Sequence, residues 1–492
     1  MKEKQKYNYL IKYVIVLAIL IVMTVLACII PTGIDLTVGD SIQDISSNIT
    51  NTAYNVNYPT SGELGQFDNG VVYVYTDPAK VESCHAGTLD KDVSLVTVDT
   101  SYPRGAQKNP YVISTLADWD NFVKKMATSG TSYGSGEYFV LANDIDFSGV
   151  TFRSVLNFNG TFYGLGFALK NISCNGAWQY WNGSSYVNYL ATHYAYGVFS
   201  FTSGTVISDL IVENYEFNDL PQTNKYIMDR GAFAGGIVGL SLGQCTILNC
   251  HTVGTMNSSN LTYGEHTVWG GIVGEHYTTA NITLYRCTAS LDACAQYANC
   301  VPVYGGILGE SIGATECLSI YDCAASITAE IPASAYVHIG SIAGIIENNK
   351  VVQFENLVGE GEVAASSKCG SSALSYVALF TSAKLNNVYV GTVTGASTST
   401  KLPLYLMNNG ALTASNSQLS NLHLYKPTSL SYATYHNAAL ATSSFTSSSP
   451  AQPTLHETYA DMYAQAQQDV DDGVLPSSIW DKTKIGNYTP AD

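Results

Sequence analysis

A five-residue motif that returns at a fixed step constrains this chain more than any other feature. Gly235-Gly236-Ile237-Val238-Gly239 returns unchanged at 270–274, with one change at 305–309, and as Gly-Ser-Ile-Ala-Gly at 340–344. Each step is 35 residues. Self-similarity at a period of about 20–50 residues is typical of solenoids, propellers and repeat arrays. An ordinary compact core is therefore not expected.

A second motif lies between the copies of the first. It consists of an apolar residue, any residue, a polar residue, and then Leu, Val or Cys. The copies are 207–210, 247–250, 284–287, 320–323, 354–357, 385–388 and 419–422. The apolar stretches are short, alternating and bounded by Gly, Asn, Ser and Thr, which indicates strands and turns rather than helices. A third short strand is expected after each second motif.

Three strands per unit, repeated in register, predict a right-handed parallel β-helix over residues 108–426. A propeller blade is less suitable because it needs four antiparallel strands and usually about 40–50 residues. Stacked coils place equivalent residues in columns. The isoleucine column is expected inside the solenoid, and the glycine column at tight corners. These columns consist of Ile237, Ile272, Ile307 and Ile342, and of Gly235, Gly270, Gly305 and Gly340.

Three cysteines belong to the second motif. Cys250, Cys287 and Cys323 stand where other copies have Leu or Val, so they are expected as small buried apolar side chains. Disulfides between neighbouring coils remain an alternative, while Cys294 with Cys300 and Cys245 with Cys317 are more suitable pairs. The column contains no histidine and the chain no Cys-x-x-Cys, so no metal site is expected.

The N-terminal segment 1–31 predicts membrane targeting. Lysines precede an uncharged apolar run over 14–30, and aspartates follow it. This asymmetry places the start of the chain inside the cell and the rest outside. The run suits a single membrane-anchor helix, and a cleaved signal peptide is the alternative. The membrane is the partner expected for this segment.

Both ends of the repeat region predict helices. Over 114–129, Leu116, Trp119, Phe122, Val123 and Met126 share one helical face, and the segment suits an N-terminal capping helix. A short C-terminal helix is expected over 455–472, within a cap segment 455–492. Residues 32–107 are expected to form an extracellular stalk or accessory segment, and 427–454 a Ser/Thr-rich connector.

The segment that contains the first of these helices resembles the opening of GLUG-repeat proteins. The resemblance rests on Tyr138-Phe139-Val140-Leu141, Asp144-Ile145-Asp146-Phe147-Ser148-Gly149 and Phe158-Asn159-Gly160-Thr161-Phe162, together with the Gly-Gly-Ile-Val-Gly copies. It covers roughly residues 108–425. It implies a pectate-lyase-like β-helix on a microbial surface protein that is adhesin-like.

Composition and motifs argue against two classes of function. The net charge is −17, which disfavours nucleic acid as a partner. The chain contains no Gly-x-Ser-x-Gly, His-Glu-x-x-His or P-loop motif. Glu275 and Glu310, beside His276, are the best candidates for a carbohydrate-active enzyme, but a solvated ladder of stacked carboxylates is the expected explanation. We therefore expect no catalytic residues and no cofactor.

A cluster of aromatic residues provides the candidate binding site. Its members are Trp178, Tyr180, Trp181, Tyr186 and Tyr189. Exposed aromatic rings can stack on sugars or anchor a protein partner. The alternative is an insertion that packs on itself and covers the side of the solenoid. The sequence thus predicts a cell-surface or extracellular protein that binds glycans or proteins, or serves as a structural stalk; a polysaccharide lyase or hydrolase is the alternative.

Overall fold

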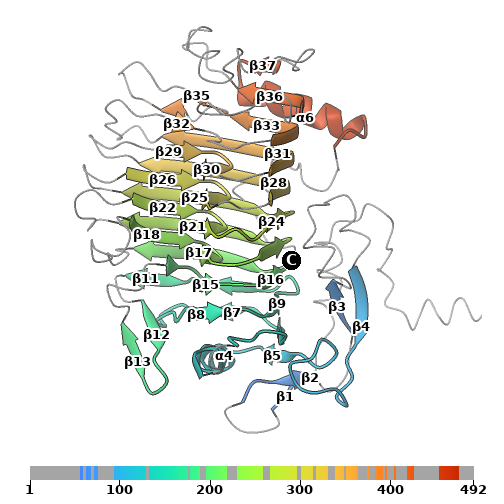
Figure 1. The fold of residues 1–492 in the computed structure, drawn as a ribbon, viewed down its shortest axis with the longest axis vertical. Helices are drawn as coiled ribbons and strands as arrows, with labels where there is room; N and C mark the ends of the chain where they lie inside the picture. The colour runs from blue at the N-terminus through green and yellow to red at the C-terminus, as the bar shows by residue number, and fades with distance from the viewer. Residues whose placement is uncertain are drawn as a thin grey trace, which may run out of the picture.

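The computed structural model shows a chain that is mostly β, with few helices. The residues it describes are 56–58, 63–67, 71–75, 93–128, 132–175, 178–188, 195–218, 230–258, 266–295, 301–313, 317–330, 338–347, 351–363, 374–375, 383–391, 394–395, 404–405, 418–425 and 454–475. Within them, the strands that form the body pair in parallel with the equivalent strands of the next coil. The body is therefore a parallel β-solenoid, seen from its side in Figure 1.

Two strips of strands flank the first motif. The first strip contains β14 (Ala195–Tyr196), β18 (Arg230–Gly235), β22 (His266–Gly270), β26 (Val301–Gly305) and β29 (His338–Gly340). The second contains β8 (Val155–Phe158), β15 (Phe199–Thr202), β19 (Val238–Ser241), β23 (Val273–Tyr277), β27 (Leu308–Ile312) and β30 (Ala343–Glu347). The first strip ends at the first glycine of the motif and the second begins at its fourth residue, so the motif forms the corner between them.

A third sheet bends around the second motif. Its early strands are β9 (Thr161–Tyr163), β16 (Thr205–Ser208), β20 (Cys245–Leu248) and β24 (Ile282–Tyr285) before the bend, and β10 (Ala168–Lys170), β11 (Ser173–Asn175), β17 (Ile211–Asn218), β21 (His251–Ser258) and β25 (Thr288–Ala295) after it. Later strands are β28 (Cys317–Glu330), β31 (Val351–Val363), β33 (Ala383–Gly391), β34 (Thr394–Gly395), β36 (Gln418–Tyr425) and β37 (Thr454–His456).

A complete coil therefore holds more strands than the sequence predicts. The coil over 266–295 contains β22, β23, β24 and β25, which is four strands rather than three. The sequence predicts the first motif as one strand, because its glycines and isoleucine are adjacent and no turn residue interrupts them. In the structure its second and third residues form a bend between two strands instead.

Backbone crowding explains the first glycine of each motif copy. A Cβ atom placed on Gly270 would lie 1.9 Å from the carbonyl oxygen of Val273, and one on Gly305 would lie 1.9 Å from that of Leu308. Real Cβ atoms do not approach backbone this closely, so this corner admits only glycine. The repeat of glycine at this position is thus a steric requirement of the fold.

The predicted isoleucine column is confirmed. Ile237, Ile272 and Ile307 are fully buried, and Ile342 is 2% exposed. Backbone hydrogen bonds join them in order: each isoleucine N–H donates to the isoleucine carbonyl of the next coil, at 2.8–3.1 Å. Burial of such a continuous apolar interior is what stabilises stacked coils that could not fold alone.

The cysteine column is also buried. Cys250, Cys287 and Cys323 are fully buried as free thiols, in register with Leu357. Each thiol donates weakly to the carbonyl oxygen of the residue two positions before it, at 3.0–3.4 Å between sulfur and oxygen. The interpretation as small apolar core residues is therefore correct. The suggested Cys245–Cys317 pair does not form, because Cys245 is a free thiol.

Thiol accessibility yields a first prediction. Burial raises the pKa of Cys245 to about 12 and the pKa of Cys250 well above its usual range, whereas Cys294 is partly exposed and its thiol donates to Glu330. We expect iodoacetamide to alkylate Cys294 at least about 100-fold faster than Cys250 in the native protein, because reaction needs an accessible thiolate. Peptide-resolved mass spectrometry measures both rates, and unfolding in urea should equalise them. Equal native rates would contradict the buried column.

A ladder of polar side chains lines the bend of the third sheet. Asp209, Asn249, Arg286, Asp322, Asn356, Asn387 and Asn421 all have φ between 49° and 54°. Asn and Asp tolerate this left-handed conformation better than other side chains with a Cβ. Their amides also join neighbouring coils, as in the bond from Asn387 Nδ2 to Asn356 Oδ1 at 2.8 Å. The asparagines of the second motif therefore lie at a corner of the coil.

Helix α4 (Leu116–Thr128) lies at the N-terminal end of the stack, beside β5 (Tyr111–Ile113), β6 (Tyr138–Leu141) and β7 (Ile145–Asp146) (Figure 1). Trp119, Phe122, Val123 and Met126 are buried, while Leu116 is 39% exposed and does not join the core. Thr115 caps the start of the helix, since Asp118 N donates to Thr115 Oγ1 at 3.1 Å.

The remaining described strands form short pairs. Three antiparallel pairs lie outside the stack: β1 (Val56–Asn57) with β2 (Gln66–Phe67), β3 (Val71–Tyr75) with β4 (Val93–Thr97), and β12 (Gln179–Trp181) with β13 (Tyr186–Asn188). The parallel pair of β32 (Leu374–Ser375) and β35 (Leu404–Tyr405) lies next to β29 and extends the first strip (Figure 1). The predicted membrane segment 1–31 and most of the connector 427–454 lie outside the described residues. Within the described ranges, no helix has the length and apolar character needed to cross a membrane.

Candidate binding hairpin and two polar clusters

The aromatic cluster forms an antiparallel hairpin beside helix α4. Strands β12 and β13 pair Tyr180 with Val187 and Trp181 with Tyr186, and the hairpin projects from the N-terminal end of the stack (Figure 1). Tyr180, Trp181 and Tyr186 are half-buried. The Trp181 and Tyr186 rings meet edge to face with their centroids 5.1 Å apart. The predicted residue Tyr189 lies outside the described residues.

Trp178 does not belong to this surface. It is fully buried and packs against Phe152, Tyr196 and Phe217, at ring-centroid distances of 6.1, 5.2 and 4.9 Å. The prediction of an exposed binding tryptophan at this position is therefore wrong. Trp178 fixes the base of the hairpin to the core, and only the rings beyond it reach the surface.

Asp120 of helix α4 holds the hairpin in place. It accepts a hydrogen bond from the Tyr186 hydroxyl and forms ion pairs with Lys124 at 2.6 Å and Arg153 at 2.9 Å. The Arg153 guanidinium also lies over the Tyr186 ring, 3.9 Å from its centroid, and Lys124 Nζ lies 5.3 Å from the centroid of Trp181. Such cation–π contacts add to the ion pairs and orient the rings.

The charges in this cluster shift two pKa values. Burial, reinforced by the hydrogen bond to the Asp120 carboxylate, raises the pKa of Tyr186. Burial alone would raise the pKa of Asp120, but the hydrogen bonds from Lys124 and Tyr186 outweigh it, and the pKa is lowered. Tyr186 is therefore a neutral donor and Asp120 an ionised acceptor at neutral pH. The contacts of Asp120 with Tyr186, Lys124 and Arg153 therefore keep one geometry near neutral pH.

The stacked carboxylates Glu275 and Glu310 face each other in register on β23 and β27, as predicted. They are nevertheless 1% and 2% exposed, so the expectation of a solvated ladder is wrong. Leu240 and Ile345 occupy the same column on either side, and both belong to an apolar cluster. A polysaccharide cannot touch carboxylates that are this deeply buried.

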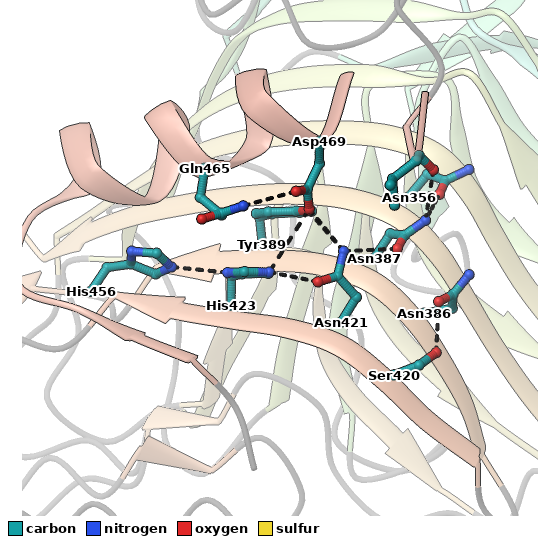
Figure 2. Close-up of polar contacts among 11 residues, drawn as sticks. Asn356, Asn386, Asn387, Tyr389, Ser420, Asn421, His423, His456, Gln465 and Asp469 are labelled. Carbon is teal, nitrogen blue, oxygen red and sulfur yellow. Dashed lines mark hydrogen bonds and ion pairs between the residues drawn. The ribbon is translucent and has the colours of Figure 1, made fainter. Parts of the chain in front are cut away.

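A third cluster, which the sequence did not indicate, joins helix α6 (Tyr459–Asp471) to the last coils (Figure 2). Asp469 accepts hydrogen bonds from the Tyr389 hydroxyl, from Asn421 Nδ2 at 2.9 Å and from Gln465 Nε2 at 2.8 Å. The His423 ring stacks flat on Tyr389, with centroids 4.5 Å apart and planes at 2°.

Apolar contacts accompany this polar cluster. Met462 and Ala466 of α6 are buried against Ala324, Val358 and Tyr389 on the outer face of the third sheet. The helix predicted over 455–472 is thus present, but it begins at Tyr459, because Thr454–His456 forms strand β37. Its docking also depends on Asp469, whose partner Tyr389 lies 80 residues away in sequence.

None of these clusters has the form of a metal site: among the described residues, no three His, Cys, Asp or Glu side chains gather so that they could hold a metal ion. No family model matches the chain, and no curated protein matches it in sequence.

Proposed function

We propose that this protein is an adhesin-like, surface-displayed β-solenoid that binds glycans through the aromatic rings of the β12–β13 hairpin. The observation that carries the proposal is the pair of half-buried rings, Trp181 and Tyr186, fixed in position by Asp120, Arg153 and Lys124. Rigid aromatic side chains supply a large contact area at little entropic cost. Charged groups beside them can exchange strong hydrogen bonds with sugar hydroxyls.

Other parts of the proposal rest on the sequence. The apolar run over 14–30 after a lysine-rich start supports export and membrane anchoring. The resemblance to GLUG-repeat proteins supports right-handed winding and display on a cell surface, and helix α4 suits the role of an N-terminal cap because it buries one face on the first coils. We favour binding over catalysis, because Glu275 and Glu310, the best candidates for the catalytic carboxylates of a lyase or hydrolase, are buried.

Loss of the hairpin rings tests the proposal. We expect Trp181→Ala to weaken binding to the glycans that the wild-type full-length chain selects on a glycan array by at least about tenfold, because a stacked aromatic anchor contributes about 2 kcal/mol. Tyr180→Ala should weaken it less. Dissociation constants for the selected glycans give the comparison.

The matched control is Tyr277→Ala. Tyr277 is a tyrosine that is 42% exposed on β23, outside the hairpin. It should bind like the wild type. Wild-type affinity in the Trp181 variant, with the fold intact by circular dichroism, would exclude the hairpin as the binding site. Reducing ends or unsaturated products released from acidic polysaccharides would favour the enzymatic alternative.

A further inference from the structure

The side-chain hydrogen bonds beneath helix α6 form a chain in which each donor points toward Asp469. Asn421 Nδ2 donates to Asp469, so its Oδ1 is left as an acceptor for His423 Nε2 at 2.8 Å. His423 Nε2 must therefore carry the proton of the neutral ring. Its Nδ1 is then a bare acceptor, and it faces His456 Nε2 at 3.0 Å (Figure 2). The neutral chain is His456 to His423 to Asn421 to Asp469.

This direction makes the two histidines unequal. His456 can take up a proton on Nδ1 and still donate through Nε2. Once His456 is protonated on both ring nitrogens, a proton added to His423 goes to Nδ1, where it would point at the Nε2–H of His456 and break the chain. Two protonated rings would also place two cations 3.0 Å apart between the nitrogens.

We propose that helix α6 is an acid-sensitive latch, with His423 as its sensor, that releases the outer face of the last coils when His423 gains a proton. The released face contains Ala324, Val358 and Tyr389, which α6 covers at neutral pH. The latch is independent of the glycan-binding hairpin, which lies at the other end of the stack (Figure 1).

The groups that face His423 support this direction of response. They are Tyr389 on β33, His456 on β37, and Asp469 on α6. Burial and the neighbouring His456 ring lower the pKa of His423 to about 4, although Asp469 opposes this shift from 4.0 Å. The pKa of His456 is lowered by burial, against the attraction of Asp461.

The sign of the effect follows from these shifts. An undocked His423 takes up a proton near its usual pKa of about 6.5, while the docked ring resists until about pH 4. Docking is therefore strongest above pH 6.5 and is lost between pH 6.5 and about 4. The pKa of Asp469 is lowered despite its burial, because Asn421, Tyr389 and Gln465 donate to the carboxylate, so its protonation weakens docking further in stronger acid.

Hydrogen exchange of the full-length chain tests the latch. After correction for intrinsic exchange rates, we expect amides of 459–471 to lose protection at least about tenfold between pH 7.5 and 4.5, while β26 and β27 keep theirs. This internal reference is needed because burial also lowers the pKa of His276, inside the solenoid, to about 4. Retained α6 protection at pH 4.5, or equal loss in both regions, would overturn the proposal.

Substitutions assign the response to its sensor. In His423→Gln we expect α6 protection to be the same at pH 7.5 and 4.5. His251→Gln is the matched control, because His251 occupies the same outward column of the sheet but bonds Thr288 through Nδ1; it should respond like the wild type. An unchanged acid response in His423→Gln refutes the proposed sensor.

Two further variants keep the result decisive if His423→Gln undocks at every pH. Asp469→Asn should be undocked already at pH 7.5 and so defines the exchange of the released helix. His456→Gln keeps an N–H donor for His423 Nδ1 and leaves His423 able to titrate, so the acid response should persist. Loss of that response in a docked His456→Gln variant would move the sensor to His456 and overturn the assignment.

Discussion

Substituting serine for Gly306 is expected to destabilise the solenoid strongly, and replacing Ala325 with glycine in the same chain is expected to restore part of the loss. A Cβ on Gly306 would lie 2.6 Å from Ala325 Cβ and 2.0 Å from the carbonyl oxygen of Ser341. Overpacking of this kind costs about 1–3 kcal/mol, and the rigid backbone contact places Gly306→Ser near the upper end of that range.

The next coil shows why the second change should help. There the motif itself carries Ser341, and the residue facing it is Gly359, where a Cβ would lie 2.5 Å from Ser341 Oγ. Gly359 is the register partner of Ala325. The chain thus exchanges a glycine–alanine pair for a serine–glycine pair across the same corner. The double variant Gly306→Ser, Ala325→Gly reproduces the second arrangement one coil earlier.

Urea unfolding of the full-length variants measures the coupling. Ala325→Gly alone should cost about 1 kcal/mol, from the lost methyl group and the added backbone freedom. The double variant should lose at least about 1 kcal/mol less stability than the two single losses added together. Part of the loss should remain, because the contact with the Ser341 carbonyl oxygen is not relieved. Ser341→Ala, which removes only a hydroxyl, should change stability little. Additive or larger losses in the double variant would refute steric exchange across the corner.

The repeat residues were predictable because the solenoid imposes the same environment at every step. Ile272 and Ile307 occupy one column, so the sequence repeats what the packing repeats. Asn356 and Asn387 recur because the bend needs a left-handed residue in each coil. The division of the first motif between two strands was not predictable, since a sharp corner between glycine-rich residues leaves no mark in the apolar pattern.

The candidate site was only partly predictable, because its burial depends on distant segments. Trp178 and Trp181 lie three positions apart in sequence, yet Phe217 packs on Trp178, which is fully buried, while Trp181 stays half-buried. Within the sequence of its own coil, nothing distinguishes Glu275 from an exposed carboxylate, although it is buried in the structure. Asp469 is held by hydrogen bonds from Tyr389 and Asn421, and only the stacking of coils brings these two residues beneath α6.

Trp178→Ala is expected to lower the free energy of unfolding by about 3–5 kcal/mol, whereas Trp181→Ala should change it by less than about 1.5 kcal/mol. Trp178 is fully buried between Phe152, Tyr196 and Phe217, so its removal leaves a cavity at the junction of the hairpin and the first coils. Trp181 is half-buried, and it loses mainly its contacts with Tyr186 and Lys124.

The two tryptophans are a matched pair because they differ in burial and not in type, and they lie three positions apart. Urea or thermal unfolding followed by circular dichroism should therefore show a larger loss of stability for Trp178→Ala than for Trp181→Ala. Glycan affinity should show the reverse, with the larger loss for Trp181→Ala, when the Trp178 variant is assayed at a temperature where it stays folded. If both substitutions destabilised the chain equally, the Trp181 ring would be part of the core, and the hairpin would be a packed cover for the solenoid. The same pair of measurements thus decides between a binding surface and a structural insertion.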